Sequence, residues 1–443
     1  MQSAKRFWVM FTLAAAALGG CTTEAAGGGD GKGDPKDKDK DGEDVASCDP
    51  SDATVVLSAT ILGYATVDFA GEQLGFGYID EDGAPTVQIH DVTAAETVTA
   101  QWSKKVVSEH YGSSYIRTSL AHNGDTFGFG WYTEADRIKE KDTWTTRFGT
   151  VAADSGETTS VADGNDDYGR AGSEDMVQAR NPHVMPFGEG FLMTWDDVRT
   201  AEPTELNVNV AGWKGIYGRR YDAKGKAAAN DVQIAQAGSP ASITGVSDGT
   251  RVMPIWSVED GKYHSRLYAR SESVFTPVKV KPLEELDSYR TTQLAAALGP
   301  DGDVLVVVER WTGYSGPTTL GSMLLSMSGT VKESYADWDD APLRSPALVA
   351  TKDGYVVAGY EMAKEDTPDA LATAVRILWL DAAGQRLSEE HVELSLAEGT
   401  HVGKLALRVQ GATVQVAFTT EAAQYYNQPF DAEVHVATVC AAP

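Results

Sequence analysis

Carboxylates and aromatic residues concentrate in the long connections that follow short apolar segments of this sequence. Asp196, Asp197, Glu309 and Glu361 each stand at the start of such a connection. Two carboxyl groups held within roughly 5 to 10 Å of each other can cleave a glycosidic bond, because one protonates the leaving oxygen while the other assists attack on the sugar. Aromatic rings beside them offer flat surfaces to sugar rings or peptide segments. The candidate ligand-binding residues are Tyr132, Trp195, Asp196, Asp197, Trp213, Trp256, Trp311, Tyr314, Tyr360, Tyr425 and Tyr426.

Several aromatic residues also have a purely structural interpretation. Each member of this group ends an apolar segment that follows a turn glycine, and the group comprises Tyr78, Trp131, Trp195, Trp256 and Tyr360. A large ring at the same place in successive repeats is typical of packing between neighbouring units. For these five residues the sequence favours packing over contact with a ligand.

The sequence lacks the motifs of several common enzyme classes. It contains no His-Glu-x-x-His zinc motif, no Gly-x-Ser-x-Gly nucleophile motif, no phosphate-binding loop and no dinucleotide-binding fingerprint. Its eight histidines are scattered, which argues against a repeated ring of metal ligands. These observations favour a protein that is not an enzyme, and they predict no cofactor.

Two acidic segments nevertheless raise the question of calcium. Asp37, Asp39 and Asp41 match the opening of a calcium-binding loop, in which oxygen ligands alternate along the chain. The twelfth position of that loop is Cys48 instead of glutamate, so a solvated linker is the stronger interpretation. Residues 163–169 also cluster carboxylate and amide oxygens, and here too a solvated loop is favoured over a calcium site.

A repeat of about 57 residues organises the chain from residue 48 onward. Each copy runs from a turn glycine through alternating apolar residues to an aromatic residue, as in 71–78, 124–131, 188–195, 249–256 and 411–418, with looser copies at 302–311 and 354–360. Tight turns containing Asn, Asp and Gly connect each copy to the apolar segment before it. Three or four short antiparallel strands per unit are the signature of β-propeller blades. We therefore expect an all-β fold resembling the propeller class, with seven blades of four antiparallel strands, and tandem β-sandwiches are the alternative.

This arrangement predicts where a binding surface would lie. The turns between the first and second strands of each unit are tight, whereas the connections between the second and third strands are long. These longer connections are 132–143, 196–213, 309–321, 361–373 and 419–431. Long loops on a rigid scaffold commonly carry binding residues, so we expect the long-loop face to be the functional one.

The amino terminus has the features of an export signal. Lys5 and Arg6 precede an apolar run at 7–18 that is too short to span a bilayer. Residues 18–21 read Leu-Gly-Gly-Cys and resemble the bacterial lipobox. That resemblance implies a signal peptide at 1–20, lipidation of Cys21 and attachment to a membrane of the cell envelope. Because Thr22 stands where an aspartate would favour the inner membrane, the resemblance favours the outer membrane, on either its periplasmic or its surface face.

Residues 21–47 are expected to form a flexible tether, because this stretch is rich in Gly, Asp and Lys and offers no apolar residues for a core. The folded domain is then expected at 48–443. The formal net charge of −27 opposes binding to nucleic acid, whose phosphates it repels. The expected partners are the membrane, through the lipid, and a protein or glycan ligand.

The cysteines predict how the ends of the domain meet. If Cys21 carries lipid, Cys48 and Cys440 remain as a pair at the two ends of the domain, and outside the cytoplasm such a pair is expected to form a disulfide. The strand expected at 54–58 has no partner in the first unit. If it completes the last unit, the disulfide closes the ring.

Three functions remain open on the sequence alone. The favoured one is a lipid-anchored binding or scaffold protein of the envelope that recognises a protein or glycan partner through the long-loop face. The alternative is a propeller-type glycan hydrolase or lyase that uses paired carboxylates. The third is the organisation of an envelope complex without any small-molecule ligand.

Overall fold

The computed structural model describes residues 50–102, 117–138, 141–159, 161–163, 179–198, 214–236, 240–259, 264–273, 275, 280–287, 290–311, 318–338, 342–362, 372–396, 400–422 and 429–440. The chain divides into two compact units, Met1–Val45 and Ala46–Pro443, and all described residues belong to the second. Every named element in the described ranges is a β-strand, which confirms the expected all-β class. No helix among the described residues is long and apolar enough to cross a membrane.

Five separate sheets each contain four antiparallel strands in sequence order. The first comprises β5 (Thr118–Asn123), β6 (Thr126–Ile138), β7 (Lys141–Ala152) and β8 (Ala162–Asp163). The second comprises β9 (Ala179–Phe187), β10 (Gly190–Val198), β11 (Lys214–Tyr221) and β12 (Val232–Gln236). The third comprises β13 (Pro240–Ser247), β14 (Val252–Glu259), β15 (His264–Ala269) and β16 (Glu284–Asp287). The fourth comprises β17 (Arg290–Leu298), β18 (Asp303–Trp311), β19 (Thr318–Ser326) and β20 (Val331–Asp337), and the fifth comprises β21 (Leu343–Ala350), β22 (Gly354–Met362), β23 (Ala372–Asp381) and β24 (Arg386–Glu393).

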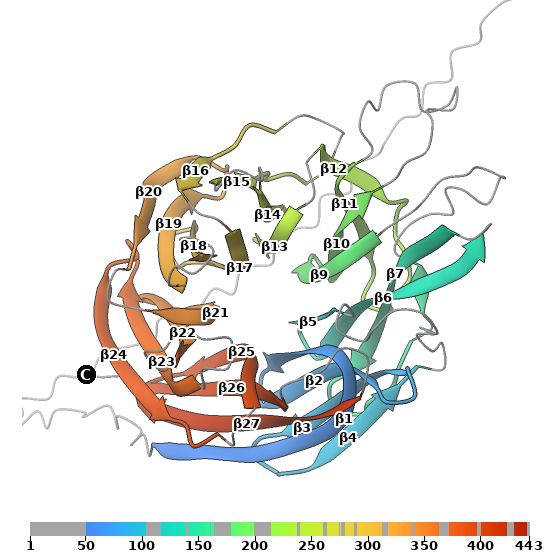
Figure 1. Ribbon diagram of the computed structural model, residues 1–443, viewed down its shortest axis with the longest axis horizontal. Coiled ribbons are helices and arrows are strands. Elements are labelled where there is room, and N and C mark those ends of the chain that lie inside the picture. Colours follow the sequence, from blue (N-terminus) through green and yellow to red (C-terminus); the bar gives the residue numbers. More distant parts are fainter. Residues whose placement is uncertain are drawn as a thin grey trace, which may run out of the picture. The chain divides into compact units, whose positions relative to one another are not determined.

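The strands near the two ends of the described chain form one larger sheet of seven strands. Its order is β25 (Thr400–Gln410), β26 (Thr413–Ala422), β27 (Phe430–Cys440), β1 (Ser51–Ala70), β2 (Gln73–Asp80), β3 (Pro85–Asp91) and β4 (Thr97–Gln101). Figure 1 shows the blue β1 running beside the red β27.

Strand β1 is the reason that these seven strands are not divided into two blades. Its first half pairs with β27, as far as Ile61 opposite Phe430, and its second half pairs with β2, starting from Ile61 opposite Asp80. The strand passes from one neighbour to the other without a turn, so no boundary separates the first and last repeats. The predicted count of seven separate four-stranded blades is therefore wrong, and the described residues form five. The predicted pairing of 54–58 with the last repeat is confirmed, because Leu57 lies opposite Val434.

The sheets are arranged in a closed ring. The first strands β5, β9, β13, β17, β21 and β25 contact one another in that order, and β1 contacts both β25 and β5 (Figure 1). We call these seven the inner strands, and they surround the axis of the ring. This arrangement confirms the propeller class and excludes the tandem β-sandwiches.

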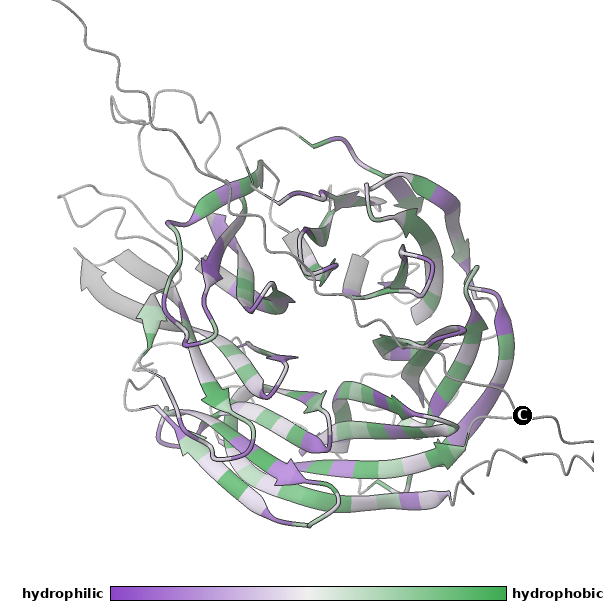
Figure 2. Cartoon of the chain, turned by 180° about the vertical axis from the view of Figure 1, so that it is seen from behind, coloured by the Kyte–Doolittle hydropathy of each residue, from purple (hydrophilic) through white to green (hydrophobic). Residues whose placement is uncertain are grey.

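Glycines and aromatic rings interlock between successive sheets. A Cβ added at Gly77 of β2 would lie 2.6 Å from a ring carbon of Phe129, and one added at Gly128 of β6 would lie 2.8 Å from Phe191. Both rings are buried. Hydrophobic and hydrophilic residues alternate along the strands (Figure 2), as expected when side chains point to opposite faces of a strand. Close sheet-to-sheet packing thus explains why glycine recurs within these second strands.

Candidate functional site

Irregular pairing marks the same end of most inner strands. The register shifts between Leu62 and Thr66 in β1, and comparable shifts occur near the starts of β9, β13, β17, β21 and β25. Gly63, Asn181 and Ser345 lie at three of these shifts and have positive φ angles of 77°, 50° and 51°. Such β-bulges redirect side chains locally. They lie opposite the ends of the second strands, where the connections to the third strands begin. The long connection predicted at 132–143 is wrong, because β6 and β7 pair as far as Ile138 opposite Lys141.

The side chain of Lys404 extends from the bulge of β25 past the neighbouring strand β21. Its ammonium donates a hydrogen bond of 2.9 Å to Oε1 of Gln293 on β17, although β21 lies between these two strands in the ring. It also interacts electrostatically with Arg117 beside β5, Glu309 on β18 and Glu421 on β26. Partners from so many sheets place Lys404 near the axis.

Lys404 is surrounded by protein but remains accessible to solvent. Desolvation and the positive charge of Arg117 lower the pKa of Lys404 to about 8, while Glu309 and Glu421 oppose this shift. The ammonium form therefore still predominates at neutral pH, and the group begins to lose its proton when the pH rises by one unit.

Glu421 lies beside Lys404, near the end of β26. Burial raises the pKa of Glu421 to about 7, against the opposing effects of the Lys404 charge, the backbone N–H of Ala65 and the hydroxyl of Thr419. A Cβ added at Gly403 would lie 2.7 Å from Oε1 of Glu421, so the absence of a side chain at 403 makes room for this carboxyl group. Glu421 can therefore hold or release a proton near neutral pH.

Glu309 provides a second carboxylate in the same place. Its side chain is buried, and its Oε2 accepts a hydrogen bond of 2.7 Å from the backbone N–H of Ser345 in the bulge of β21. Nε2 of Gln293 donates to Oγ of the same serine at 2.8 Å. Gln293 thus connects Ser345 to Lys404, and these contacts hold the groups from β17, β18, β21 and β25 together.

Tyr360 of β22 completes this group of residues. Burial and the neighbouring Glu309 carboxylate raise the pKa of its hydroxyl, although a hydrogen bond with Arg344 opposes the shift. The phenol therefore stays protonated throughout the physiological range. We call Gln293, Glu309, Tyr360, Lys404 and Glu421 the central cluster.

His183 of β9 is near enough to the central cluster for the charge of Lys404 to act on it. Burial, followed by the positive charge of Lys404, lowers the pKa of His183 to about 4. Its Nε2 is buried and has no hydrogen-bond partner among the described residues. The imidazole is therefore neutral at pH 7.

The carboxylates predicted on β10 are engaged locally. Asp196 is buried and accepts a hydrogen bond of 2.7 Å from Nδ2 of Asn181, the bulge residue of β9. Asp197 is also buried, and its Oδ2 accepts a bond of 3.3 Å from Nε1 of Trp195. Both carboxylates help to hold the structure around the second strand of this sheet.

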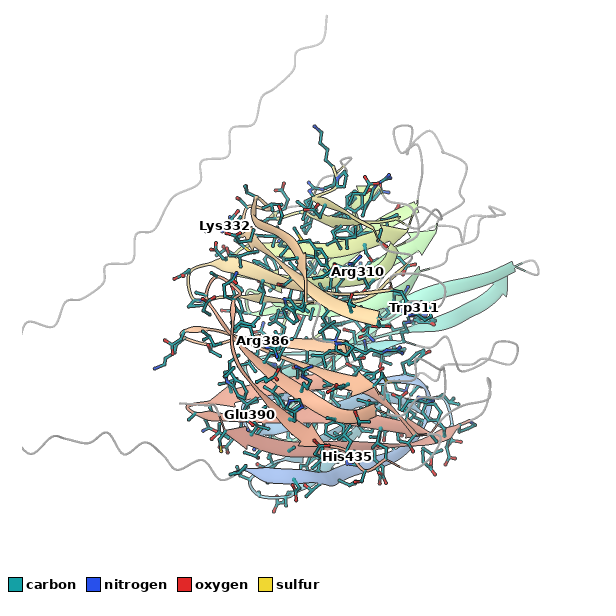
Figure 3. The ribbon with its side chains drawn as sticks, turned by 60° about the vertical axis from the view of Figure 1, so that its left-hand side comes forward. Arg310, Trp311, Lys332, Arg386, Glu390 and His435 are labelled. Carbon is teal, nitrogen blue, oxygen red and sulfur yellow. The ribbon has the colours of Figure 1, made fainter. Side chains whose placement is uncertain are left out.

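The aromatic residues selected from the sequence fall into three groups. Tyr132, Trp195 and Trp256 are at most 2% exposed, so their rings offer no surface to a ligand. The packing residues Trp131 and Tyr78 are also buried, at 0% and 4% exposed. Tyr360 belongs to the central cluster. Trp311 is partly exposed at the end of β18, next to Arg310 (Figure 3). Arg310 itself donates a hydrogen bond to Asp337. Trp213, Tyr314, Tyr425 and Tyr426 lie outside the described residues.

Several central residues carried no recognised signal in the sequence. Lys404, Gln293 and His183 lie in bulges or beside them, and a bulge is not visible in an alternating pattern. Glu421 could have been found, because it lies near the end of a second strand, as Glu309 does. Of the four predicted carboxylates, the structure shows only Glu309 in the central cluster.

The metal and cysteine hypotheses fall largely outside the described ranges. Cys21, Cys48 and the Asp37 to Asp41 segment are outside them, as are 164–169. Within the described ranges, no group of three or more His, Cys, Asp or Glu residues is placed to hold a metal ion. Cys440 ends β27, and Ser51 pairs with Thr438, so the chain just after Cys48 runs beside the chain just before Cys440.

Comparisons with known proteins identify the fold and no family. The chain matches no protein family and no curated protein. It is similar to the polysaccharide lyase Uly1, with a TM-score of 0.50 and 9% identity, over 84% of this chain and 89% of the lyase. It is also similar to an α-L-arabinanase from Penicillium chrysogenum (TM-score 0.47, 11% identity, 74% of this chain and 93% of that one). The β-propeller domain of the Trilobed protease from Pyrococcus furiosus gives a TM-score of 0.42 and 9% identity, over 83% and 97%.

Proposed function

We propose that this protein is a glycan-cleaving enzyme, a hydrolase or a lyase, which uses Glu309 and Glu421 as a pair of carboxyl groups at the axis of the ring. The observation that carries the proposal is the convergence of these two residues on Lys404. Glu309 comes from β18, whereas Glu421 and Lys404 come from β26 and β25. Charged groups from separate sheets that meet at a solvent-accessible point are expected at a catalytic site more than in a structural core.

The two carboxyl groups have different environments, as acid and base catalysis require. Glu421, with a pKa of about 7, is protonated in a substantial fraction of molecules at neutral pH and can donate that proton to the leaving glycosidic oxygen. The hydrogen bond from the Ser345 N–H stabilises Glu309 as a carboxylate. In hydrolysis, Glu309 accepts a proton from water while the water oxygen bonds to the anomeric carbon.

The same donor would serve elimination. In a lyase, Glu309 accepts the proton from the carbon beside a uronate carboxyl group, a carbon–carbon double bond forms, and the expelled sugar oxygen takes the proton of Glu421. The polysaccharide lyase Uly1 shares this fold over most of both chains, which is consistent with glycan cleavage on such a scaffold. The two chemistries leave different products, so they can be distinguished directly.

The test is cleavage of a polysaccharide panel by protein without residues 1–47. We expect release of new reducing ends from at least one of arabinan, xylan, polygalacturonate and dextran sulfate. E421Q should lose about 100-fold or more of kcat/KM, since a positioned general acid contributes roughly that much, and E309Q should lose a comparable amount. E333Q, on the exposed face of β20, is the matched control and should keep full activity.

Two results would overturn the proposal. The first is absence of cleavage across the panel by folded wild-type protein. The second is full activity of E421Q. If cleavage occurs, oxygen-18 from water in the product identifies a hydrolase, and an unsaturated sugar at the new end identifies a lyase.

The binding-scaffold function predicted from the sequence has weaker support. It relied on aromatic platforms, and Tyr132, Trp195 and Trp256 are buried. A scaffold also does not account for a carboxyl group and an ammonium group whose pKa values both lie near neutrality. Glycan cleavage accounts for both.

We also propose that a lipid on Cys21 holds the enzyme in the cell envelope, at the outer membrane. The support is the lipobox-like tetrad at 18–21 and the polar segment that follows it. Labelling with a radioactive or alkyne palmitate should mark the wild-type precursor and not C21S, and C48S should be labelled as strongly as wild type. A C21S protein that still carries label and still sediments with membranes would refute the proposal.

A further inference from the structure

An exposed aromatic ring and an arginine lie together beside the central cluster. Tyr64, in the bulge of β1, is 46% exposed. The guanidinium carbon of Arg117 lies 5.9 Å from the centroid of its ring. A parallel β-bridge joins the two residues, and Oγ1 of Thr118 donates a hydrogen bond of 2.9 Å to the carbonyl oxygen of Tyr64. The backbone therefore fixes this pair while the two side chains face solvent.

The pair is directly connected to the proposed acid. Ala65, the next residue after Tyr64, donates its backbone N–H to the carboxyl group of Glu421. Arg117 is close enough to Lys404 for its charge to lower the pKa of that ammonium. Tyr64 and Arg117 thus lie next to the point at which a glycosidic bond would be cleaved.

The charges at this place favour an anion. Arg117 and Lys404 are both exposed, and they repel each other. Within the described part of the chain no ion pair joins Arg117 to a carboxylate. The Glu309 carboxylate offsets one of these two positive charges, and Glu421 offsets less than the other near neutral pH, because it is partly protonated there. A carboxylate or sulfate bound between the two cations would relieve their repulsion, and a guanidinium suits both groups because it can donate two parallel hydrogen bonds.

We propose that Tyr64, Arg117 and Lys404 form a subsite for an acidic sugar unit of a glycan. The face of the sugar ring stacks on Tyr64, and its carboxylate or sulfate group lies between Arg117 and Lys404. The subsite names a substrate class for the proposed enzyme, an anionic polysaccharide. As a determinant of which glycan is cleaved, the subsite rests on the proposed function. Because the protein has a net charge of −27, nonspecific attraction of a polyanion is disfavoured, and binding must depend on such a local site.

Binding is measured with E421Q, so that turnover does not consume the ligand. The probes are two matched pairs of polymers: polygalacturonate against its fully methyl-esterified form, and dextran sulfate against dextran. We expect the anionic member of at least one pair to bind at least tenfold more tightly than its neutral counterpart. The pair with the larger ratio shows whether the recognised group is a carboxylate or a sulfate.

Variants in the E421Q background connect this preference to Arg117 and Tyr64. R117Q should lower affinity for the anionic polymer at least tenfold and leave the neutral polymer unaffected, whereas Y64A should weaken both. K352Q removes an exposed lysine from the tight turn between β21 and β22 and should bind like the parent. Circular dichroism and the Tm of each variant show that it is folded.

The outcomes separate the two proposals. Equal affinity for the charged and neutral members of both pairs, or an anion preference unchanged in folded R117Q, overturns the acidic subsite, even if wild type cleaves neutral arabinan. Anion binding that depends on Arg117, in a protein that cleaves no polymer, supports the subsite and refutes the enzymatic function. Cleavage confined to the charged polymers, and reduced by R117Q, supports both.

Discussion

Lys404 and Gln293 form a hydrogen bond of 2.9 Å although 111 positions of sequence separate them. Strand β21 lies between their two strands in the ring, so the contact bypasses a neighbouring strand and crosses toward the axis. The Lys404 ammonium is thereby held beside Glu421, where its charge lowers the pKa of the carboxyl group against the larger, opposite effect of burial. This relationship determines the pH dependence expected of the site.

Activity should fall as the pH rises through about 7, because the proposed donor Glu421 must carry its proton. K404M removes the positive charge that lowers the pKa of Glu421, so the alkaline limb of kcat/KM should move to higher pH. K404R keeps a positive charge and should retain a limb close to that of wild type. An alkaline limb at the same pH in K404M and wild type would show that Lys404 does not act on the donor.

Replacement of Gly403 should impair the site without removing a reactive group. In G403A the new methyl group would overlap Oγ1 of Thr419 and lie 2.7 Å from Oε1 of Glu421, so that carboxyl group must move. We expect kcat to fall about tenfold or more, since small displacements of catalytic groups are costly. The Tm of G403A should change less than the Tm of variants in which a contact between two sheets is altered, such as G77A. Unchanged kcat in G403A would mean that the position of Glu421 is not critical.

The interlocking of glycine and aromatic residues predicts a measurable coupling between sheets. G77A places a methyl group 2.6 Å from the ring of Phe129 and should lower the free energy of unfolding by about 1–3 kcal/mol. F129L should also destabilise the protein, because it leaves a cavity. In the double variant the smaller side chain accepts the new methyl group, so the loss should be less than the sum of the two single losses. Denaturant unfolding measures all three, and strict additivity would contradict the proposed contact.

His122 should make stability depend on pH. Its Nδ1 lies 2.9 Å from Oδ2 of Asp68, and this hydrogen bond raises the pKa of His122 above its usual value, against the effect of burial. A raised pKa in the folded state means that the contribution is fully present below about pH 6.5 and is lost as the pH rises through the folded value. Both side chains are partly exposed, so we expect no more than about 1 kcal/mol. The difference in Tm between wild type and H122Q should therefore be larger at pH 5.5 than at pH 8.5.

The proposed disulfide between Cys48 and Cys440 predicts a redox-dependent stability. Mass spectrometry of non-reduced peptides should show the two cysteines linked, and reduction should lower the free energy of unfolding by about 2–5 kcal/mol. C48S, C440S and the double variant should be equally destabilised, because each removes the same bond. Free thiols at both positions in protein isolated from an oxidising compartment would disprove the link.

The repeat in the sequence was sufficient for the fold class and for the pairing of most strands. Alternating apolar residues and turns such as 122–125 are local features, and they determine where strands begin and reverse. The pairing of 54–58 with the last repeat was predicted, but the continuation of β1 without a turn into its pairing with β2 was not, because an apolar segment reads the same whichever neighbour it pairs with. Its division between β27 and β2 depends on the two ends of the chain meeting.

By itself the sequence also determined that Glu309 and Tyr360 stand at the ends of second strands, and it favoured packing over ligand contact for Trp195 and Trp256. Only the tertiary structure decided that Trp195 and Trp256 are buried and that Lys404, Glu309 and Glu421 share one place at the axis. The physical reason is distance. Hydrophobic alternation acts between residues close in the chain, whereas burial, charge proximity and the resulting pKa values depend on sheets that closure of the ring brings together.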